Sequence, residues 1–560
     1  MTSPSVSPLK LRSTLALLMA RALTEHFGTE EPPVEVTPSR NLKMGDLACS
    51  SAMPLAGVVK KPPVEIAAVM AAAVKGVSQV EKVSVDGPGF LNFTLSNSYL
   101  QEVIACMSDS GITGLMPDTG KGRTALVEFV SSNPTGPLTV GHCRQAVLGD
   151  AVSGLLESSG WKVEREYYFN DAGKQMERLA QSVAARYMQN AGGQMDIPEG
   201  GYKGEYIREW AADLRSLKGD HLSWPEDLAV FRAYGAERAF ELIKGDLELL
   251  GIKFDRFFPE SDLIPHAVNQ AIEKLRNENV VYSDSQAPEK LWLKLTEMGR
   301  PEDRVIIRDD GTCTYRMPDI AYHLNKFSRN YDLIVDIFGS DHIDTCRDVE
   351  AALTRLLGEE RVKGVLKTIL HQFVTLLRNG EKVKMSTRQG EFVTLRDLVE
   401  EVGAPDVVRY IFLTRRAEAH MDFDLASAAS DSDDNPVFYV QYAFARISGI
   451  FRNTPGVQTI LACGEKNAHL LTGERERDLM RLLETIPLRI HAAAEALEPH
   501  RITEMLAEVA TAFHSFYQHH RVHDPGNKSL TAARLMLCSA VRNSLNDMLR
   551  IIGVKAPEKM

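Results

Sequence analysis

The sequence lacks any apolar run long enough to cross a membrane and any pair of cysteines at metal-binding spacing. A membrane helix needs about 18 consecutive apolar residues, whereas the richest stretch, 66–74, is short and has apolar residues at helical spacing. The seven cysteines are scattered, and no two form a Cys-x-x-Cys pair. We therefore expect no metal site, no disulfide scaffold and no membrane span, and the scattered cysteines favour a reducing compartment, the cytoplasm.

The sequence also lacks internal repeats, low-complexity segments and a convincing signal peptide. Lys10 and Arg12 precede an apolar stretch, as in a secretory signal, but Arg21, Glu25 and His26 interrupt it, so we expect a helix. The chain has 64 basic and 75 acidic side chains, a net charge of −11. A chain of negative net charge is not an obvious nucleic-acid binder. Because binding depends on local basic surface, however, the net charge is only a weak argument against nucleic-acid binding.

The 560 residues, 44% apolar and 25% charged, predict a globular protein of about three or four domains. Residues 1–115 predict an α+β domain, with strands at 83–85 and 90–95 around a Gly/Pro turn. In the second strand, apolar residues at 91, 93 and 95 alternate with Asn92 and Thr94, which predicts one exposed face. The segment 108–123 is rich in Gly, Ser and Asp and predicts a linker.

The remaining chain divides into an α/β region and a helical region. Residues 116–420 predict an α/β domain, with strands at 125–130, 163–169, 333–338 and 365–370 and a helix at 141–157. The helical, charged stretch at about 171–300 predicts an insertion. Residues 421–560 show helical periodicity and no clear strand, which predicts a helix bundle.

The strongest local pattern is the run from Val127 to His142, VEFVSSNPTGPLTVGH. A buried strand leads through a Pro/Gly-rich loop into a helix start, whose free N–H groups suit a phosphate. Gly141 would let a nucleotide approach the backbone closely, and His142 can donate a hydrogen bond to a phosphate oxygen. The alternative, a surface loop with a histidine at a helix start, is weaker because of the preceding strand and loop.

Two further patterns are ambiguous when taken singly. The run 384–390, KMSTRQG, follows the turn Asn379-Gly380. It can clamp a triphosphate, but it also fits a solvated basic hairpin. The run 338–342, FGSDH, ends an apolar strand, where ligands bind in open α/β sheets. There, Ser340 or Asp341 can equally cap the next helix.

Together, and in this order, the three patterns resemble the signature motifs of a class I aminoacyl-tRNA synthetase. Four stretches are similar to the arginyl-tRNA synthetase family: Gly87–Phe93, Glu128–His142, Asn435–Arg446 and Leu549–Met560. The resemblance covers nearly the whole chain. It implies an α/β, Rossmann-like catalytic domain between an α+β N-terminal tRNA-core-binding domain and an all-α C-terminal anticodon-binding bundle.

The resemblance implies an arginine–tRNA ligase. Such an enzyme uses ATP, accompanied by Mg²⁺, to activate L-arginine to arginyl-adenylate, and then transfers the arginine to tRNA(Arg). The family commonly needs bound tRNA before it activates the amino acid. We expect a monomer.

The resemblance also implies the site residues, by matching positions. Arginine would be bound by Glu128, Ser131, Asn133, Tyr315 and Asp319. ATP would be bound by Thr139, Gly141, His142, Asp341, His342, Lys384, Met385 and Ser386, with His142, Lys384 and Arg388 catalytic. Transfer RNA would contact Asn92, Tyr442, Arg446 and Met560. In the insertion, Tyr202, Tyr206 and Trp210 either form a packing cluster, which we favour, or help to guide the acceptor end of a tRNA.

Elementary chemistry supports some of these roles and leaves others open. Glu128 is a carboxylate inside an apolar run and needs a partner, which a substrate guanidinium would supply. For Tyr315 and Asp319 the alternative is an ordinary helix entry. Tyr439, Tyr442 and Arg446 share one helical face and suit stacking on bases, although the tyrosines also fit a bundle core. Asn92 equally fits a solvated edge.

Two departures from the family pattern define the competing hypotheses. The first motif has Thr139 where the family usually has His, and the second has Thr387 where a second Lys is usual. These substitutions are the only support for a non-catalytic tRNA-binding paralogue. Such a protein would not need Glu128, His142, Asp319 or Lys384. A third hypothesis, a small nucleotidyltransferase that binds no tRNA, leaves the outer domains without a purpose.

Overall fold

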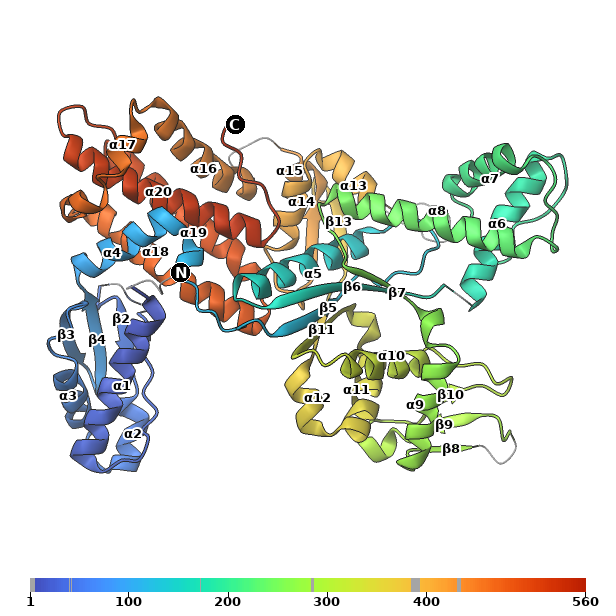
Figure 1. The fold of residues 1–560 in the computed structure, drawn as a ribbon, viewed down its shortest axis with the longest axis horizontal. Helices are drawn as coiled ribbons and strands as arrows, with labels where there is room; N and C mark the ends of the chain where they lie inside the picture. Colours follow the sequence, from blue (N-terminus) through green and yellow to red (C-terminus); the bar gives the residue numbers. More distant parts are fainter. Residues whose placement is uncertain are drawn as a thin grey trace. The chain divides into compact units, whose positions relative to one another are not determined.

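The structure, a computed structural model, describes residues 6–39, 41, 43–171, 173–283, 287–383, 393–430 and 435–560 (Figure 1). The chain divides into two compact units, residues 120–431 and residues 1–119 together with 432–560. Within the described ranges, no helix has the length and apolar character that crossing a membrane requires.

The unit at 120–431 is built on a five-stranded parallel sheet in the order β12-β11-β5-β6-β7. Its strands are β5 (Thr124–Glu128), β6 (Lys162–Phe169), β7 (Arg256–Pro259), β11 (Leu333–Gly339) and β12 (Leu366–His371). The apolar runs form strands because helices cover both faces of the sheet. The four predicted strands are confirmed, but β7 lies inside the stretch 171–300, so the interpretation of that whole stretch as an insertion is wrong.

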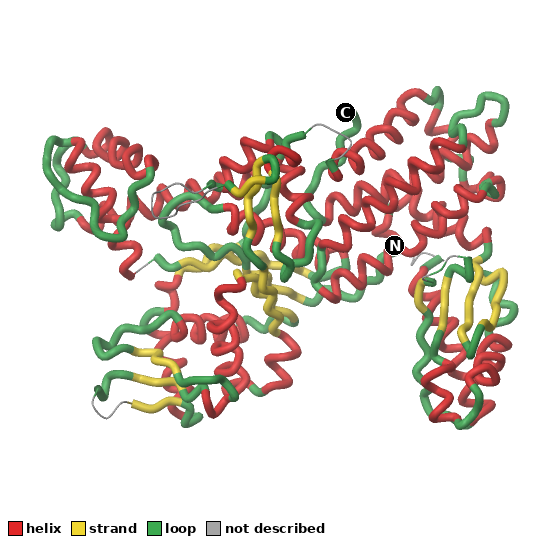
Figure 2. The backbone as a smooth tube through the Cα atoms, turned by 180° about the vertical axis from the view of Figure 1, so that it is seen from behind, coloured by secondary structure: helices red, strands yellow, loops and turns green. Residues whose placement is uncertain are grey.

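Helices lie on both faces of this sheet (Figures 1 and 2). One face carries α5 (Val140–Ser158), followed outward by α13 (Leu395–Val402) and α14 (Pro405–Phe412). The other carries α9 (His266–Asn277), α10 (Arg316–Ser328), α11 (Ile343–Leu357) and α12 (Glu359–Val365). The predicted inward positions of α5, such as Val147 and Leu155, are buried.

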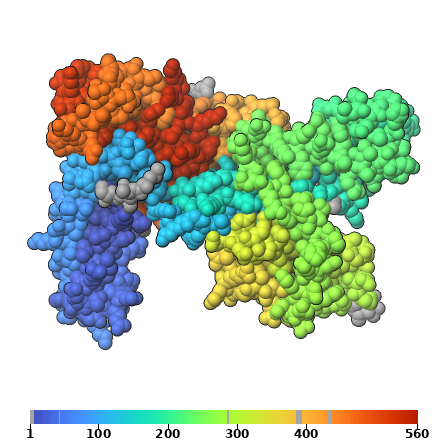
Figure 3. All heavy atoms as spheres, viewed as in Figure 1, coloured from blue at the N-terminus to red at the C-terminus, as the bar shows by residue number. Residues whose placement is uncertain are grey.

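Residues 173–249 form a helical lobe, which Figure 3 shows in green at the right end of the view. It comprises α6 (Gly173–Asn190), α7 (Glu205–Lys218) and α8 (Leu228–Leu249). Tyr202, Tyr206 and Trp210 belong to its apolar core, which confirms the predicted packing cluster. After β7 comes a small antiparallel sheet of β8 (Val281–Ser283), β9 (Leu291–Leu293) and β10 (Arg304–Ile307).

A third sheet closes the unit, in the order β14-β13-β15. Its elements are β13 (Val374–Arg378), β14 (Glu381–Lys382), β15 (Met421–Asp424) and the short α15 (Leu425–Ala428). Asn379 and Gly380, at φ 54° and 81°, form the predicted turn between β13 and β14. Because β15 pairs with β13, the expectation of no strand after residue 421 is wrong at this point.

The other unit begins with an α+β domain, as predicted. Its elements are α1 (Pro8–Phe27), β1 (Thr37–Pro38), β2 (Leu47–Cys49), α2 (Ala52–Val59), α3 (Pro63–Ala73), β3 (Val80–Asp86), β4 (Phe90–Leu95) and α4 (Asn97–Ser110). The antiparallel sheet has the order β1-β2-β4-β3. The helix α4 occupies the first residues of the predicted linker 108–123, and Ile112 and Leu115 in that segment are buried.

The expectation of an exposed face on β4 is wrong at Asn92. This side chain is only 7% exposed. Its amide donates a hydrogen bond to Asp86 Oδ2 at 2.7 Å, and Ser84 donates to the same oxygen. The polar residue in the alternating pattern is therefore satisfied inside the domain instead of by solvent.

The rest of this unit is the predicted helix bundle, of α16 (Pro436–Asn453), α17 (Val457–Leu461), α18 (Glu474–Ala496), α19 (His500–His519) and α20 (Lys528–Ile551). A buried ion pair ties α1 to α18. The Arg12 guanidinium donates two hydrogen bonds, of 2.8 and 2.9 Å, to the carboxylate of Glu484, which also accepts from the Tyr99 hydroxyl.

Removing the cation of this pair will destabilise the unit. Arg12→Met leaves the Glu484 carboxylate, which is 1% exposed, with only the Tyr99 hydroxyl. We expect the free energy of unfolding to fall by about 3–5 kcal/mol, measured by urea denaturation of the full chain. Lys61→Met is the matched control, because Lys61 and Glu65 form an exposed pair that contributes about 0.5 kcal/mol or less. Equal losses in the two variants would contradict this account.

Candidate active site

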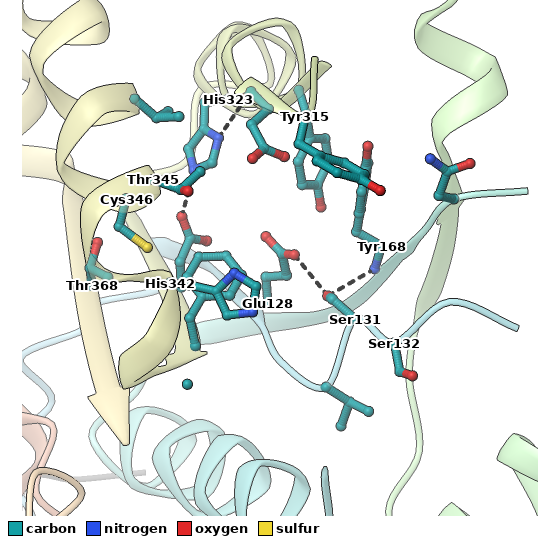
Figure 4. A pocket seen from close by; sticks show the side chains of 18 of the residues that line it. Glu128, Ser131, Ser132, Tyr168, Tyr315, His323, His342, Thr345, Cys346 and Thr368 are labelled. Atoms are coloured by element: carbon teal, nitrogen blue, oxygen red, sulfur yellow. Dashed lines mark hydrogen bonds and ion pairs between the residues drawn. The ribbon is translucent and has the colours of Figure 1, made fainter. Parts of the chain in front are cut away.

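A cavity of about 540 Å³ lies where the carboxyl ends of β5, β6 and β11 meet α10 and α11 (Figure 4). Its position is the usual one for a ligand in an open α/β sheet. All five predicted arginine-binding residues line it, together with His142 and His342. The structure thus brings together side chains that are up to 214 positions apart in the sequence, from Glu128 to His342.

The strand β5 ends in a strained reversal that forms one wall of the cavity. Ser131 N–H donates to the Phe129 carbonyl at 2.9 Å, and Val130 between them has φ 68°. A β-branched residue is costly in this left-handed conformation. The Ser131 side chain holds the turn, since its hydroxyl donates to Glu128 Oε1 at 2.7 Å and accepts from the Tyr168 backbone N–H at 3.2 Å. The predicted strand at 125–130 therefore stops at Glu128.

The loop after this reversal is fixed from the neighbouring elements. Asn133 Oδ1 accepts from the Asn170 N–H at 3.1 Å, and Asn133 Nδ2 donates to Gln175 on α6 at 2.5 Å. The Tyr206 hydroxyl of the helical lobe donates to the Thr135 carbonyl at 3.1 Å. The predicted substrate-binding loop is therefore held in one conformation by the helical lobe.

The partner of Glu128 is a residue that the sequence analysis missed. Lys326 on α10 forms an ion pair with Glu128 and a second, of 2.6 Å, with Asp336 on β11. All three side chains are 2% exposed or less. The expected need of Glu128 for a partner is thus met within the chain by Lys326, and a substrate guanidinium would be an additional partner. Burial raises the pKa of Glu128, an effect that Lys326 opposes, and the two carboxylates keep the pKa of Lys326 above its usual value.

The network ends at His323, one turn before Lys326 on α10. His323 Nδ1 faces the Asp319 carbonyl and Nε2 faces Asp336 Oδ2, each at 2.8 Å. Lys326 and His323 hold the pKa of Asp336 well below its usual value, so both partners of the ring are acceptors. The ring of His323 therefore links the Asp319 carbonyl to Asp336, and the network joins Glu128, Lys326, Asp336 and His323.

Asp319 is the carboxylate that this network leaves uncompensated. Its side chain lines the cavity and has no hydrogen-bond partner among the described residues. Burial, with a further contribution from the charges of Glu128 and Glu260, raises its pKa to about 7, against the opposing effect of His323 and Lys326. An unpartnered carboxylate that lines a cavity is a binding point for a cation. The predicted role of Asp319 fits this geometry.

Two tyrosines and Glu260 complete this end of the cavity. The Tyr168 hydroxyl donates to Glu260 Oε2 at 2.6 Å, and the Asn170 amide donates to Oε1 at 2.8 Å. Burial raises the pKa of Glu260. Tyr315 precedes α10 and is 70% exposed, so it stands at the mouth of the cavity. An aromatic ring there can cover a bound side chain.

The helix α5 presents its N-terminus to the cavity. The Thr139 N–H donates to His142 Nδ1 at 3.2 Å, and the two residues form a capping box. Nδ1 is an acceptor, so Nε2 carries the hydrogen and can donate to a ligand. Burial, with a smaller effect of His371, lowers the pKa of His142 to about 4. His142 is therefore a neutral hydrogen-bond donor at neutral pH.

The remaining predicted nucleotide contacts differ in position. Gly141 is exposed on the first turn of α5, and an added Cβ would meet only Thr139 Oγ1, at 3.8 Å. His342 lines the cavity, whereas Asp341 beside it is exposed and outside the lining. The other predicted nucleotide and catalytic residues, Lys384, Met385, Ser386 and Arg388, lie outside the described residues.

The predicted tRNA contacts in the helix bundle form a small aromatic surface. Tyr442 is 41% exposed, and the Arg446 guanidinium lies 4.6 Å from its ring and 5.1 Å from that of Tyr517. Tyr439 is half-buried against His514 of α19, so packing is the better account of that residue. Met560 is exposed.

Sequence signals for the missed residues were available. Asp319, His323 and Lys326 stand at i, i+4 and i+7, which places them on one helical face. Asp336 interrupts the apolar strand 333–338 in the way that Glu128 interrupts 125–130. Two buried charges on neighbouring strands require a cation nearby, and the helix face supplies it.

Three models of known protein families match the chain. The arginyl tRNA synthetase N-terminal domain matches residues 13–95 and the catalytic domain of class I (R) tRNA synthetases matches 107–209 and 233–409. The DALR anticodon-binding domain matches residues 440–560.

Individual proteins are similar over nearly the full length. The arginine–tRNA ligases of Bacillus velezensis and Bacillus subtilis are each 41% identical over 534 residues, covering 94% of this chain and 95% of their own. The structure of Thermus thermophilus arginyl-tRNA synthetase, at 20% identity, covers 98% of this chain and 100% of its own with a TM-score of 0.75, which is a likeness of fold.

The capping box makes a testable prediction for His142. We expect the neutral Nε2–H tautomer from pH 7 down to about pH 5, because its pKa is about 4. Nitrogen-15 spectra of the labelled imidazole would measure this. The urea-unfolded chain is the control, since an unperturbed histidine titrates near about 6.5. A cationic ring or an Nδ1–H tautomer at pH 7 would contradict the geometry.

Proposed function

The chain belongs to the arginyl-tRNA synthetase family, and we propose that the cavity described above is where it activates L-arginine with ATP. The chain is an arginine–tRNA ligase of class I. It forms arginyl-adenylate and transfers arginine to the 3′ end of tRNA.

Asp319 carries the proposal for the amino acid. In this account its carboxylate accepts hydrogen bonds from the substrate guanidinium, whose fixed charge replaces the proton that Asp319 binds when the site is empty. Glu128 lines the same space and offers its oxygens as a second acceptor, while Lys326 balances its charge. Tyr315 covers the substrate side chain, and Ser131 with Asn133 positions the α-amino end.

The N-terminus of α5 is the proposed phosphate contact. His142 donates from Nε2–H, and Gly141 lets the nucleotide lie against the backbone. Thr139 has no imidazole for a phosphate contact, unlike the histidine that is usual at this position. It contributes instead to the N-cap of α5. Asp341 and His342, at the end of β11, and the loop residues Lys384, Met385, Ser386 and Arg388 remain predicted nucleotide contacts, with His142, Lys384 and Arg388 as predicted catalytic groups.

We propose Mg²⁺ only as the companion of ATP. Among the described residues no group of three His, Cys, Asp or Glu side chains could hold a metal ion. Magnesium generally keeps waters and phosphate oxygens as ligands, so its site would be made by the nucleotide. No side chain of the protein is proposed as a metal ligand.

For tRNA we propose contacts through Tyr442 and Arg446, where a base can stack beside the guanidinium, and through Met560. Asn92 stays a proposed contact only through its backbone or a rearranged amide, because its side chain is bonded to Asp86. We further propose a cytoplasmic monomer that uses tRNA(Arg). All seven cysteines are unpaired, which supports a reducing compartment.

One of the two substitutions that support the non-catalytic hypothesis has a structural role. Thr139, in place of the usual histidine, has a local use as the N-cap of α5. The uncompensated Asp319 carboxylate costs free energy in an empty cavity, and a protein that only binds tRNA has no need of it.

Arginine-dependent exchange of labelled pyrophosphate into ATP, run with and without tRNA, tests the function. We expect exchange in the wild type and an increase of about 100-fold in the arginine KM of Asp319→Asn, because a charge-assisted hydrogen bond is lost. The ATP KM should change little. No exchange in either condition, with tRNA still bound, would favour the non-catalytic paralogue, and equal losses for both substrates would remove Asp319 from the guanidinium.

The same carboxylate makes arginine binding depend on pH. Its pKa is about 7 in the empty site, and only the ionised form opposes a guanidinium. The arginine Kd should therefore be constant above pH 7 and rise about tenfold per pH unit below it. Glu260→Gln should move the break to lower pH, because it removes one of the charges that raise the pKa of Asp319. A break that does not move would assign it to another group.

Alanine substitutions at two glycines of α5 distinguish a position that contacts the nucleotide from a position that is constrained by packing. Gly141→Ala should leave the free energy of unfolding unchanged or raise it by up to about 1 kcal/mol, because the added Cβ meets nothing close. It should weaken ATP binding about tenfold. Gly149→Ala is the matched control, since its Cβ would lie 2.1 Å from the Phe129 ring, and it should lose about 1–3 kcal/mol of stability. Unchanged ATP affinity in Gly141→Ala would contradict the proposed approach.

A further inference from the structure

The cavity continues beyond the proposed guanidinium site. Glu128, Asp336 and Thr368 are direct register partners on the adjacent strands β5, β11 and β12, and all three line it. With neighbouring strands about 4.8 Å apart, this row extends about 10 Å across the sheet. Asn133 and Tyr168 lie on the β6 side of Glu128, and Thr368 lies on the opposite side.

The far end of the cavity has a different chemistry from the near end. It is lined by Thr345, Cys346 and Val349 of α11 and by Leu366 and Thr368 of β12. Figure 4 shows Cys346 and Thr368 at one end of the cavity and Tyr315 and Tyr168 at the other. Neither threonine hydroxyl has a hydrogen-bond partner among the described residues, and the thiol is neutral, because burial raises the pKa of Cys346 to about 12.

Asp336, the charged group between the two ends of the cavity, needs no ligand to balance its charge. Asp336 is bonded to Lys326 and His323, so it requires no further cation. Beyond it, the far end offers space and two hydroxyl groups without any charge to be matched. Thr368 is exposed on the edge strand β12, and Glu350 at the rim is exposed as well, so the far end is not sealed from solvent.

We propose that this far end accepts an uncharged substituent on the terminal guanidino nitrogen, so that the site binds Nω-alkylated arginines. The inference rests on the proposed position of the guanidinium between Asp319 and Glu128. A substrate with its α-amino end at Asn133 then directs its terminal nitrogens along the row towards Asp336 and Thr368. An alkyl group leaves the guanidinium charged, so the contact with Asp319 is kept.

The test uses the full chain and Nω-propyl-L-arginine as a competitor in arginine-dependent pyrophosphate exchange. We expect an inhibition constant within about tenfold of the arginine KM, because a closed pocket would reject three added carbons far more strongly. Cys346→Phe fills the far end. It should raise the inhibition constant of the propyl compound at least about tenfold and change the arginine KM less than about twofold.

Cys463→Phe is the matched control, because Cys463 is exposed in the helix bundle, and it should change neither constant. If Cys346→Phe does not fold, Thr368→Leu, on an exposed edge position, gives the same readout. An inhibition constant more than about 100-fold above the arginine KM would overturn the inference. So would equal effects of the filling variant on both ligands, or no effect on either. Absence of exchange with arginine itself would instead overturn the proposed function on which the inference depends.

Discussion

The buried ion pairs of Lys326 with Glu128 and Asp336 are the interaction on which the rest of the site depends. Two carboxylates on adjacent strands cannot stay buried and ionised unless a cation lies between them. Lys326 fulfils this condition, and His323 Nε2 lies 2.8 Å from Asp336 Oδ2. Because Lys326 opposes both carboxylates, β5, β11 and α10 can pack together. Asp319, two turns before Lys326 on α10, stays outside these ion pairs and lines the cavity.

The rigidity of the loop that follows β5 has a separate origin. Val130 adopts a strained conformation that persists only because several contacts over-determine it. The Ser131 hydroxyl bridges Glu128 and the Tyr168 backbone, and the Tyr206 hydroxyl reaches the same loop from the helical lobe. The loop is thus tied to the charge network through Glu128. A change in that network would alter the position of Ser131 and Asn133 as well as the local charge.

Sequence patterns predicted most of the sheet, since continuous apolar runs identify buried parallel strands directly, and the similarity of motifs identified the residues of the cavity. Sequence patterns failed where the position of a strand or side chain depends on partners that are distant in the sequence. β7 is only four residues long and lies between helices, so its pairing with β6 has no local signal. Asn92 was expected on an exposed face because alternation does not reveal that Asp86 accepts its amide. Lys326 was missed because its two partners come from strands that only the fold makes neighbours.

Under the proposed function, the raised pKa of Asp319 explains how a site for a permanent cation can exist without its ligand. A fully ionised, unpartnered carboxylate in this cavity would oppose folding. With a pKa of about 7, the group shares a proton with solvent when the site is empty, which limits that cost. A guanidinium cannot give up its own proton, so it displaces the proton from Asp319 and restores the charge. In this account binding exchanges one cation for another, and the ion pairs of Lys326 with Glu128 and Asp336 are kept in both states.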